Sequence, residues 1–443
     1  PDEARASPPI TVGSMPPRSL RRRRLLAALV LAAALPLARP LGAQEAPSAT
    51  AEVFRRFADR VVKIQVVETG SAARATIGSG FFVSAEGHVV TNYHVVSKIV
   101  HDPGRYRAEL IDVAGSIAPV EILAIDVVHD LAVLRADVRP ERHFALAPAT
   151  ATQGTRLYAL GHPNDLGLSI VEGTNNGLLR HTLYPKIHFT GSLNPGMSGG
   201  PTIDADGRVI GINVATAGNQ ISFLVPVDRA VELAARAMAP DHAPPADLLA
   251  EVGRQIEAHQ RVYLADMLAG EPKTVDLGPY RAITEPAPFF RCWGDVDRGQ
   301  DRPYEAVYHH CSTDDYLFIA DDQISGVVEV SHALVTTSSL NRWRFYSLYT
   351  DLFAHDETPA GSEEHVTSWR CATRNVRNAT TPLRAVLCLR RYRKLAELYD
   401  AVLRVAVLGH TDSGLVSTLA LSGVGHDNIV TLTDRYLESI TWR

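Results

Sequence analysis

Short runs of apolar and β-branched residues recur over residues 51–238, and turn residues separate them. Residues 61–67, with the sequence VVKIQVV, are one such run, and Gly, Pro, Asn and Asp supply the turns. Runs of this length and spacing are typical of the strands of antiparallel barrels. The last run, residues 223–228, leads into a short helical segment that ends at Met238. We therefore expect a mainly β domain over residues 51–238.

The pattern changes after Met238. Residues 239–270 begin with several prolines, which indicate a linker, and then carry apolar side chains at helical spacing among charged ones. We interpret this segment as a Pro-rich linker and an amphipathic helix. Residues 271–443 form a separate C-terminal domain in this interpretation, of α+β or mainly β class and of unknown function. Its expected strands include 316–319, 327–330 and 343–346, and one further helix is expected over 394–405.

The beginning of the chain has the composition of an export signal. Residues 15–43 comprise a basic start with four consecutive arginines, an apolar run of 13 residues and the small-residue sequence LGA before Gln44. Because a membrane-spanning helix needs roughly 20 residues, cleavage before Gln44 is favoured, with an uncleaved membrane anchor as the alternative. The arginines also suit a twin-arginine signal, so the export route stays open. Residues 1–14 resemble neither a signal nor a fold, and the chain is expected to be periplasmic or secreted.

The composition is that of a globular chain of two or three domains, with 443 residues, 46% apolar and 21% charged. The formal net charge is −5, but the first 43 residues hold seven Arg against two acidic residues. The remaining chain therefore has 37 basic and 47 acidic residues, a net charge of −10. This balance argues against nucleic acid as the main partner.

All four cysteines lie in the C-terminal domain: Cys292, Cys311, Cys371 and Cys388. An even number in an exported chain predicts two disulfides with three possible pairings, and the local pairing, first with second and third with fourth, is preferred. Buried free thiols are the alternative. No Cys-x-x-Cys spacing occurs, and His309 and His310 beside Cys311 are too few ligands on their own, so no metal or other cofactor is expected.

Candidate chemistry is concentrated at residues 191–201, with the sequence GSLNPGMSGGP. Glycines on both sides of Ser198 leave the backbone free to expose the hydroxyl and to let nearby amides converge. In acyl transfer, the amides of Gly196 and Ser198 would form an oxyanion hole, in which each donor contributes roughly 3 to 4 kcal/mol. Such a serine also needs a base and a carboxylate that orients the base. A Gly-rich hairpin with a surface serine is the alternative interpretation.

The chain supplies both partners upstream of Ser198. Residues 78–83 and 88–96 indicate two strands that end on His94, and this run resembles the histidine motifs of chymotrypsin-fold serine proteases, which makes His94 the candidate general base. The apolar strand that begins at Asp130 resembles the aspartate motif of the same family, so Asp130 is the candidate orienting carboxylate, with Asp126 as the weaker alternative. Each residue alone is more often structural. Their order His, Asp, Ser, with separations of 36 and 68 residues, favours a catalytic triad.

These segments resemble chymotrypsin-fold serine proteases, and NPGMSGG around Ser198 is similar to the nucleophile loop of the HtrA/Deg branch. GSGF and TNYHV, which leads through His94, resemble the histidine motifs of that family, and DLAVL from Asp130 its aspartate motif. The resemblance covers residues 51–238 and implies a double antiparallel β-barrel of the chymotrypsin type. His94 and Asp130 would stand on the first six-stranded barrel and Ser198 on the second. No PDZ-like GLGF loop is recognised after Met238.

The resemblance also implies an activity and a substrate class. The expected enzyme is a serine endopeptidase that forms an acyl-enzyme and acts on unfolded proteins or peptides in quality control or processing, with homo-oligomers as one form of assembly. Its expected substrate pocket involves Ser192, Leu193, Asn213, Val214 and Ala215. None of these is charged, which predicts cleavage after small or medium apolar residues. A catalytically silent binding or structural protein on the same scaffold is the alternative function.

One position departs from the family pattern. Met197 precedes the nucleophile, where relatives carry Asp or Asn. A buried ion pair between a carboxylate at this position and a new N-terminal amine is therefore not available. We expect assembly or substrate to order the loop instead.

Overall fold

The computed structural model describes residues 48–442, except for 217, 219, 272, 300, 301, 314, 322, 355–360 and 379. The expected export signal at 15–43 and the segment 1–14 lie outside the described residues. No helix in this described part of the chain is both long enough and apolar enough to cross a membrane.

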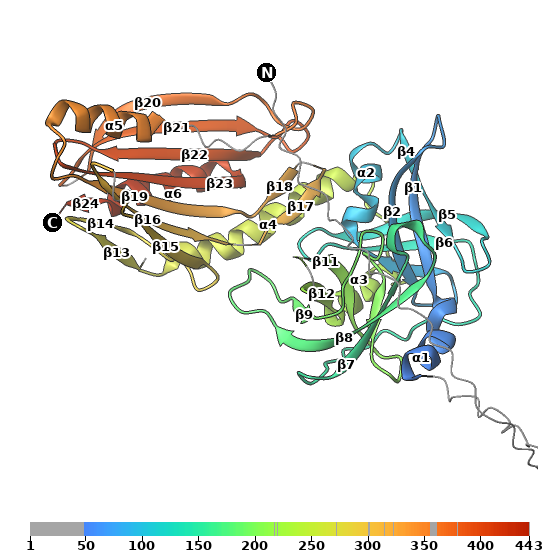
Figure 1. Ribbon diagram of the computed structural model, residues 1–443. Helices are drawn as coiled ribbons and strands as arrows, with labels where there is room; N and C mark the ends of the chain where they lie inside the picture. The colour runs from blue at the N-terminus through green and yellow to red at the C-terminus, as the bar shows by residue number, and fades with distance from the viewer. Residues whose placement is uncertain are drawn as a thin grey trace, which may run out of the picture. The chain divides into compact units, whose positions relative to one another are not determined.

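A short helix and a closed barrel begin the described chain (Figure 1). Helix α1 (Ala49–Phe57) starts after Ser48, whose hydroxyl accepts a hydrogen bond from the Ala51 amide, and the 3-10 turn η1 (Ala58–Arg60) follows. The six strands pair in the order β1-β2-β3-β6-β5-β4. They are β1 (Val61–Glu68), β2 (Arg74–Phe82), β3 (His88–Thr91), β4 (Tyr106–Ile111), β5 (Ile117–Asp126) and β6 (Leu131–Ala136). Helix α2 (Tyr93–His101) follows β3 directly and buries Tyr93, Val95 and Val96.

A second closed barrel follows, with the strand order β10-β11-β12-β9-β8-β7. Its strands are β7 (Arg156–Gly161), β8 (Ser169–Leu178), β9 (Ile187–Phe189), β10 (Pro201–Ile203), β11 (Val209–Thr216) and β12 (Ser222–Pro226), with the 3-10 turn η2 (Pro163–Asp165) after β7. Helix α3 (Val227–Ala237) ends this part and buries Val227, Ala230 and Leu233. The predicted pair of antiparallel six-stranded barrels is confirmed.

One apolar cluster joins the two barrels. Phe81 from β2 and Phe144 from the segment between the barrels pack in the same cluster as Tyr158 and Ile212 of the second barrel. Phe144 stands edge-on to Phe81, with 5.7 Å between ring centroids. Because burial of each large apolar side chain contributes about 1.5–3 kcal/mol, this cluster holds the barrels in a fixed arrangement. Residues on the two barrels can therefore form one site.

Helix α4 (Leu248–Ala269) follows the proline-containing segment. It begins after Asp247, whose carboxylate accepts hydrogen bonds from the amides of residues 249 and 250, a cap that contributes about 1 kcal/mol. The Gln255 side chain donates to the Ile125 carbonyl and accepts from the Val127 amide, both at 2.8 Å. The helix is thereby tied to the turn after β5.

The C-terminal region contains an open seven-stranded antiparallel sheet with the order β15-β16-β19-β23-β22-β21-β20 (Figure 1). Its strands are β15 (Arg291–Asp297), β16 (Glu305–Ser312), β19 (Val328–Thr336), β20 (Arg370–Arg377), β21 (Pro382–Arg391), β22 (Leu398–Val407) and β23 (Ser413–Gly425). Smaller units are the three-stranded sheet of β13 (Thr274–Leu277), β14 (Tyr280–Ile283) and β24 (Thr441–Trp442), and the hairpin of β17 (Leu317–Ala320) and β18 (Gln323–Ser325).

Two helices cover opposite faces of the seven-stranded sheet. Helix α5 (Arg342–Ala354) packs Phe345 against Val416 of β23, whereas α6 (His426–Ser439) packs in a cluster that contains Leu415 and Leu419 of the same strand. Successive side chains of a strand point to opposite faces, so odd-numbered and even-numbered residues of β23 meet different helices. The region therefore has one apolar layer on each side of its sheet.

Two expectations for this region were wrong. Residues 343–346 belong to α5 rather than to a strand, and residues 398–405 belong to β22 rather than to a helix. In α5, Phe345 and Tyr349 are four residues apart and both buried, which is helical spacing. Strand β22 is buried on both faces, so its apolar run lacks the alternation that distinguishes a half-exposed strand from a buried helix.

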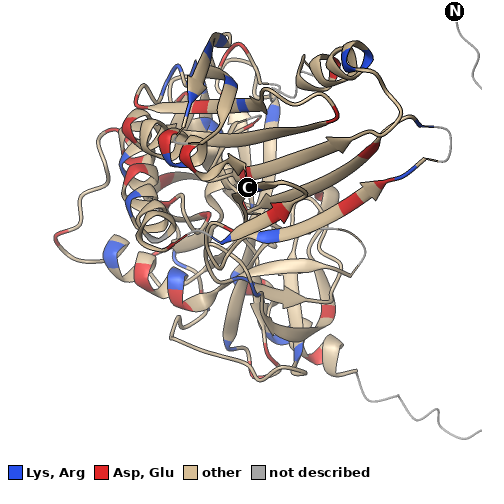
Figure 2. Ribbon diagram, turned by 90° about the vertical axis from the view of Figure 1, so that its left-hand side faces the viewer, with Lys and Arg blue, Asp and Glu red and all other residues tan. Residues whose placement is uncertain are grey.

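Basic and acidic residues are interspersed along the ribbon in Figure 2. In the C-terminal region, Arg281 pairs with Asp276 at 3.0 Å and Arg298 with Glu305 at 2.7 Å. Exposed pairs of this kind contribute about 0–1 kcal/mol each. Surface charge therefore adds little to the stability of this region compared with its apolar layers and its disulfides.

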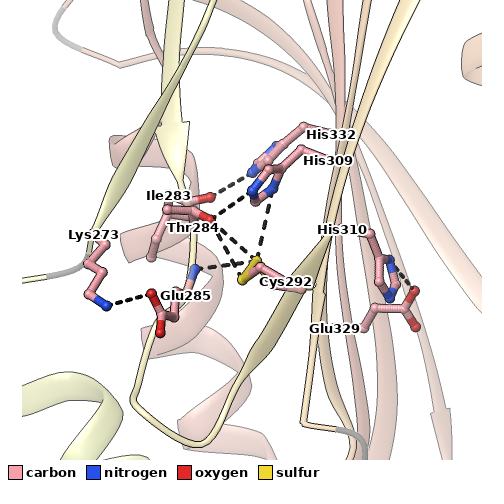
Figure 3. The surroundings of a disulfide bond; sticks show 10 residues. Lys273, Ile283, Thr284, Glu285, Cys292, His309, His310, Glu329 and His332 are labelled. Atoms are coloured by element: carbon pink, nitrogen blue, oxygen red, sulfur yellow. Dashed lines mark hydrogen bonds and ion pairs between the residues drawn. A yellow bond between two sulfur atoms is a disulfide. The ribbon is translucent and has the colours of Figure 1, made fainter. Parts of the chain in front are cut away.

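The two disulfides have the preferred local pairing, Cys292–Cys311 and Cys371–Cys388. Each joins directly opposed residues, on β15 and β16 and on β20 and β21, and β15 and β20 are the exposed edge strands of the sheet. In Figure 3, Thr284 and His309 lie beside the first of these bonds. Closing loops of this size stabilises the fold by roughly 3 kcal/mol each, so the cross-links hold strands that have little packing of their own.

Candidate active site

His94 and Asp130 meet at the end of the first barrel. His94 is the second residue of α2, and Asp130 lies in the turn between β5 and β6. Asp130 Oδ2 accepts a hydrogen bond from His94 Nδ1 at 2.6 Å, and Oδ1 accepts from the His94 backbone amide at 2.8 Å. Asn92 Nδ2 donates to the Asp130 carbonyl at 2.7 Å, which supports a backbone with φ of +54°. The carboxylate therefore keeps the proton on Nδ1 and leaves Nε2 as the acceptor.

Asp126, the alternative acid, has a different partner. Its Oδ1 accepts from the His129 amide at 3.0 Å and its Oδ2 from His129 Nδ1 at 2.8 Å. These bonds close the turn that presents Asp130. The carboxylate that orients His94 is thus Asp130, and Asp126 supports the loop.

The electrostatic surroundings of His94 favour its protonated form. Burial lowers the pKa of His94, but the charge and hydrogen bond of Asp130, with a smaller contribution from Asp321, outweigh burial and raise the pKa above its ordinary value. The side chain remains 26% exposed, so the ring is accessible. An imidazole with a raised pKa is a stronger base once it is neutral.

Ser198 lies on the loop between β9 and β10, in a turn in which the Met197 amide donates to the Asn194 carbonyl at 3.0 Å. Gly196 has φ of +94°, and a Cβ there would lie 2.4 Å from the His162 carbonyl oxygen, so only glycine fits. Ser198 and His94 line one cavity of about 320 Å³. Its other lining residues are Ile77, Leu193, Asn194, Pro195, Gly196 and Val214.

The Ser198 hydroxyl has a hydrogen-bond partner other than His94 in this structure. Its Oγ donates to the Val214 carbonyl at 3.5 Å, and within the described residues no hydrogen bond joins it to His94. Proton transfer requires Oγ and Nε2 to approach to about 2.6–3.2 Å. Proton transfer from Ser198 to His94 would therefore require the serine side chain to turn away from Val214.

Two amides of the loop are available to an incoming oxygen. The amides of residues 197, 199 and 200 donate to the carbonyls of residues 194, 213 and 197. Over the described part of the chain, the amides of Gly196 and Ser198 have no such acceptor. Unpaired amides beside a serine hydroxyl can stabilise a developing oxyanion.

The loop is supported from within the protein. The Ser79 amide donates to the Ser198 carbonyl at 2.8 Å, and the Ser79 hydroxyl donates to the Gly196 carbonyl at 2.7 Å. Asn213 Nδ2 donates to the carbonyls of Leu160 at 3.0 Å and Met197 at 3.1 Å. The Met197 side chain is fully buried in the apolar core of the second barrel. These contacts support the loop from within the barrels, with Met197 at the position where relatives carry Asp or Asn.

The residues expected to bind substrate have different positions. Leu193 and Val214 line the cavity, whereas Ser192 is exposed and is not among the lining residues. The Asn213 side chain is fully buried beneath the loop, where it donates a hydrogen bond to the Met197 carbonyl. Ala215 belongs to β11, and its side chain lies outside the described residues.

Sequence reasoning missed two neighbours of the site. Ser79 lies inside the GSGF motif, whose predicted strand and family resemblance give this serine no role, although the motif itself is a signal for its position. The Phe318 ring lies 5.9 Å from that of His94, centroid to centroid. No local pattern indicates this contact, because the two residues are far apart in the chain.

One group of side chains has the geometry of metal ligands. Potential ligand atoms of Cys292, His309 and Cys311 lie within 4.8 Å of one another (Figure 3). The two sulfurs are joined in a disulfide, and a cysteine binds metal as the thiolate. In the oxidised protein this group is therefore a cross-link.

Residues 78–212 match the family model described as "Trypsin-like peptidase domain". The two barrels thus have the chymotrypsin fold, and this part of the chain is similar to trypsin-like peptidases, among them the HtrA and Deg proteases.

Two curated relatives and one solved structure illustrate this similarity. The chain is 32% identical over 204 residues to the "Probable periplasmic serine endoprotease DegP-like" of Halomonas elongata. This alignment covers 44% of this chain and 42% of that protein. It is 32% identical over 195 residues to "Serine protease HTRA2, mitochondrial" of Bos taurus, which covers 40% and 41%. The solved "Crystal structure of Deg5" is 28% identical with a TM-score of 0.38, covering 43% of this chain and 94% of that one. The chain thus spans less than half the length of both curated relatives.

Proposed function

We propose that this protein is a serine endopeptidase in which Ser198 is the nucleophile, His94 the general base and Asp130 the group that orients the base. The observation that carries the proposal is a shared cavity. His94, already paired with Asp130, and Ser198, with unpaired amides at positions 196 and 198, line the same space of about 320 Å³. The similarity of residues 78–212 to trypsin-like peptidases supports it.

The proposed reaction proceeds through an acyl-enzyme. Substrate displaces the Ser198 hydroxyl from Val214 towards His94 Nε2. As Oγ attacks the peptide carbonyl, its proton passes to Nε2, and Asp130 stabilises the imidazolium through the 2.6 Å hydrogen bond. The carbonyl oxygen becomes negative and accepts hydrogen bonds from the amides of Gly196 and Ser198, a contribution of about 3 to 4 kcal/mol per donor. His94 then protonates the leaving amine, and water repeats the sequence to release the acid.

The lining of the cavity supports cleavage after small or medium apolar residues. Ile77, Leu193, Pro195 and Val214 contribute apolar surface, and no Asp, Glu, Lys or Arg is among the described lining residues. A Lys or Arg side chain of a substrate would lose hydration there without a counter-ion. Cleavage-site mapping with a peptide library tests this, and a strong preference for basic residues would contradict it.

The proposed biological setting is an exported protease that acts on unfolded proteins or peptides in quality control or processing. The printed name of the Halomonas relative, a periplasmic endoprotease, supports this setting. The C-terminal region would then control assembly, including homo-oligomers, or access of substrates to the barrels.

A catalytically silent scaffold is the second candidate function. The observation in its favour is the Ser198 hydroxyl, which contacts Val214 and not His94. Labelling with a fluorophosphonate probe distinguishes the two. We expect the wild type to be labelled and Ser198→Ala to be unlabelled, with turnover lower by about a million-fold. Ser71→Ala, an exposed serine of the first barrel, serves as the control that keeps labelling. A folded wild type that the probe does not label would favour the silent scaffold.

A further inference from the structure

A hairpin of the C-terminal region packs on the helix that carries His94. In this hairpin β17 pairs with β18, and the Ile319 carbonyl of β17 accepts hydrogen bonds from Tyr93 Oη at 2.8 Å and from His101 Nε2 at 2.9 Å. Tyr93 and His101 are the first and last residues of α2. The hairpin is therefore bonded to both ends of this helix.

Phe318, the neighbour of Ile319, contacts His94. Its half-buried ring stands edge-on to the imidazole, with 5.9 Å between centroids and 68° between the planes, and edge-on to Tyr93 at 6.3 Å and 65°. Edge-to-face packing is a favoured arrangement of aromatic rings. The hydrogen bond from Nδ1 to Asp130 restrains one side of the imidazole, and Phe318 restrains its ring plane from another element.

The hairpin is anchored on both sides of this contact. Ser325 Oγ donates to the Gly423 carbonyl at 2.9 Å, which joins the hairpin to β23. Before the hairpin, Asp315 accepts hydrogen bonds from Lys186 Nζ at 2.7 Å and from the Leu183 amide at 3.1 Å, in the loop between β8 and β9. The Asp315 side chain is only 8% exposed, so this pair is shielded from solvent. The position of Phe318 is thus set by the sheet on one side and by the second barrel on the other.

Several charged or titratable groups surround His94. Asp130 approaches from the turn after β5, Asp321 from the hairpin, and Lys98, Tyr93 and His101 belong to α2. Asp321 forms an ion pair with Lys98. Burial lowers the pKa of His94, whereas Asp130 and, to a smaller extent, Asp321 raise it. Burial also lowers the pKa of His101 to about 4, so His101 stays neutral where His94 titrates.

We propose that Phe318 is a positioning residue for His94: the C-terminal region places an aromatic wall against the imidazole and holds it in the orientation that presents Nε2 to Ser198. This inference rests on the proposed function and extends it. It gives the C-terminal region a part in the chemistry, beyond control of assembly or access.

The pKa of His94 in variants of the full chain tests this directly. Phe318→Ala opens the imidazole to water and relieves the burial that lowers the pKa, so the pKa of His94 should rise. Asp321→Asn removes a negative charge, so the pKa of His94 should fall in this variant. The fall should be only a few tenths of a unit, because the charge of Asp321 is exposed and screened. NMR titration in a Ser198→Ala background, with the His94 signal assigned by its loss in His94→Gln, measures both shifts.

The signs of the two shifts separate positioning from simple docking. If the hairpin only docked the C-terminal region, either variant would release it, and both would shift the pKa of His94 in the same direction. Shifts of equal sign, or an unchanged pKa in Phe318→Ala, would overturn the proposal.

Turnover is the second readout. Phe318→Ala should lower kcat/KM by roughly tenfold to a hundredfold, mainly through kcat, because the base is no longer held in line. Phe318→Tyr, which restores the ring, should recover most of this loss, and Ile324→Ala, an exposed residue of the same hairpin, should have no effect. A wild type without turnover contradicts the proposed function, while the titration still decides on Phe318. If the wild type turns over substrate and Phe318→Ala has the same rate and the same His94 pKa, the result contradicts this inference and leaves the proposed function standing.

Discussion

The two barrels and the C-terminal region are both antiparallel β structures, but they secure their strands differently. Each barrel strand has two neighbours because the sheets close. The C-terminal sheet is open, and its exposed edge strands β15 and β20 are cross-linked to their neighbours. Closure leaves the segments that connect the strands, helix α2 among them, free to carry His94, Asp130 and Ser198 on a rigid framework. In the open sheet the cysteines serve stability, and the separate β17–β18 hairpin brings Phe318 against His94.

The largest expected effect tests whether the chemistry belongs to the barrels. Asp130→Asn should lower kcat by about ten-thousand-fold, because an amide in place of the carboxylate favours the wrong tautomer of His94. Steady-state kinetics on a peptide substrate measures this. The matched change in the C-terminal region is Tyr349→Phe, which removes buried hydrogen bonds to the Val407 carbonyl at 3.1 Å and the Leu415 carbonyl at 2.6 Å and should lower stability without changing kcat. A comparable loss of kcat in both variants would contradict the division between the regions.

Met197→Ala tests the internal support of the nucleophile loop. Truncation of this fully buried side chain should destabilise the protein by about 2–5 kcal/mol through the cavity it leaves. We also expect slower labelling by a fluorophosphonate probe, since the loop loses its apolar anchor. Denaturant titration and labelling rates measure the two effects. Met238→Ala, at an exposed position, is the control, and equal labelling of Met197→Ala and wild type would show that the anchor is dispensable.

Removal of the Cys371–Cys388 disulfide tests whether the edge of the C-terminal sheet affects stability without affecting the site on the barrels. Replacing Cys371 and Cys388 together by Ser should lower the free energy of unfolding of the C-terminal region by roughly 3 kcal/mol. Probe labelling of Ser198 at temperatures where the variant is folded should stay unchanged, because this disulfide lies at the edge of the sheet. Calorimetry and labelling provide the two measurements. A fall in labelling that follows the loss of the disulfide under folding conditions would indicate that the whole sheet supports the site.

The smallest expected effect is the pH dependence of the barrel site. Protonated His94 cannot accept a proton, so kcat/KM should rise about tenfold per pH unit below the pKa and level off above it. Burial lowers the pKa of His94, but Asp130 and Asp321 together raise it by more than burial lowers it. The midpoint should therefore lie above the ordinary value of 6.5. A pH–rate profile of the free enzyme measures it. A midpoint below 6.5 would mean that burial dominates over the carboxylates.

The predictability of each region from sequence follows the same contrast. Motifs around His94, Asp130 and Ser198 lie within short segments, so the barrels and the candidate site could be proposed from local residues. The disulfide pairing could also be preferred, because each pair is close in the chain. Strand β22 could not be distinguished from a helix, since burial on both faces removes the alternation of a strand. The contact between Phe318 and His94 depends on how distant segments pack, which no local pattern encodes.

Ser79 stands on the first barrel, yet it holds the loop of Ser198, which belongs to the second. A chain in which only one barrel has formed has either Ser79 in place or the loop of Ser198 in place, but not both. We therefore expect hydrolytic competence to emerge late in folding, so that an immature molecule cannot digest itself or its neighbours.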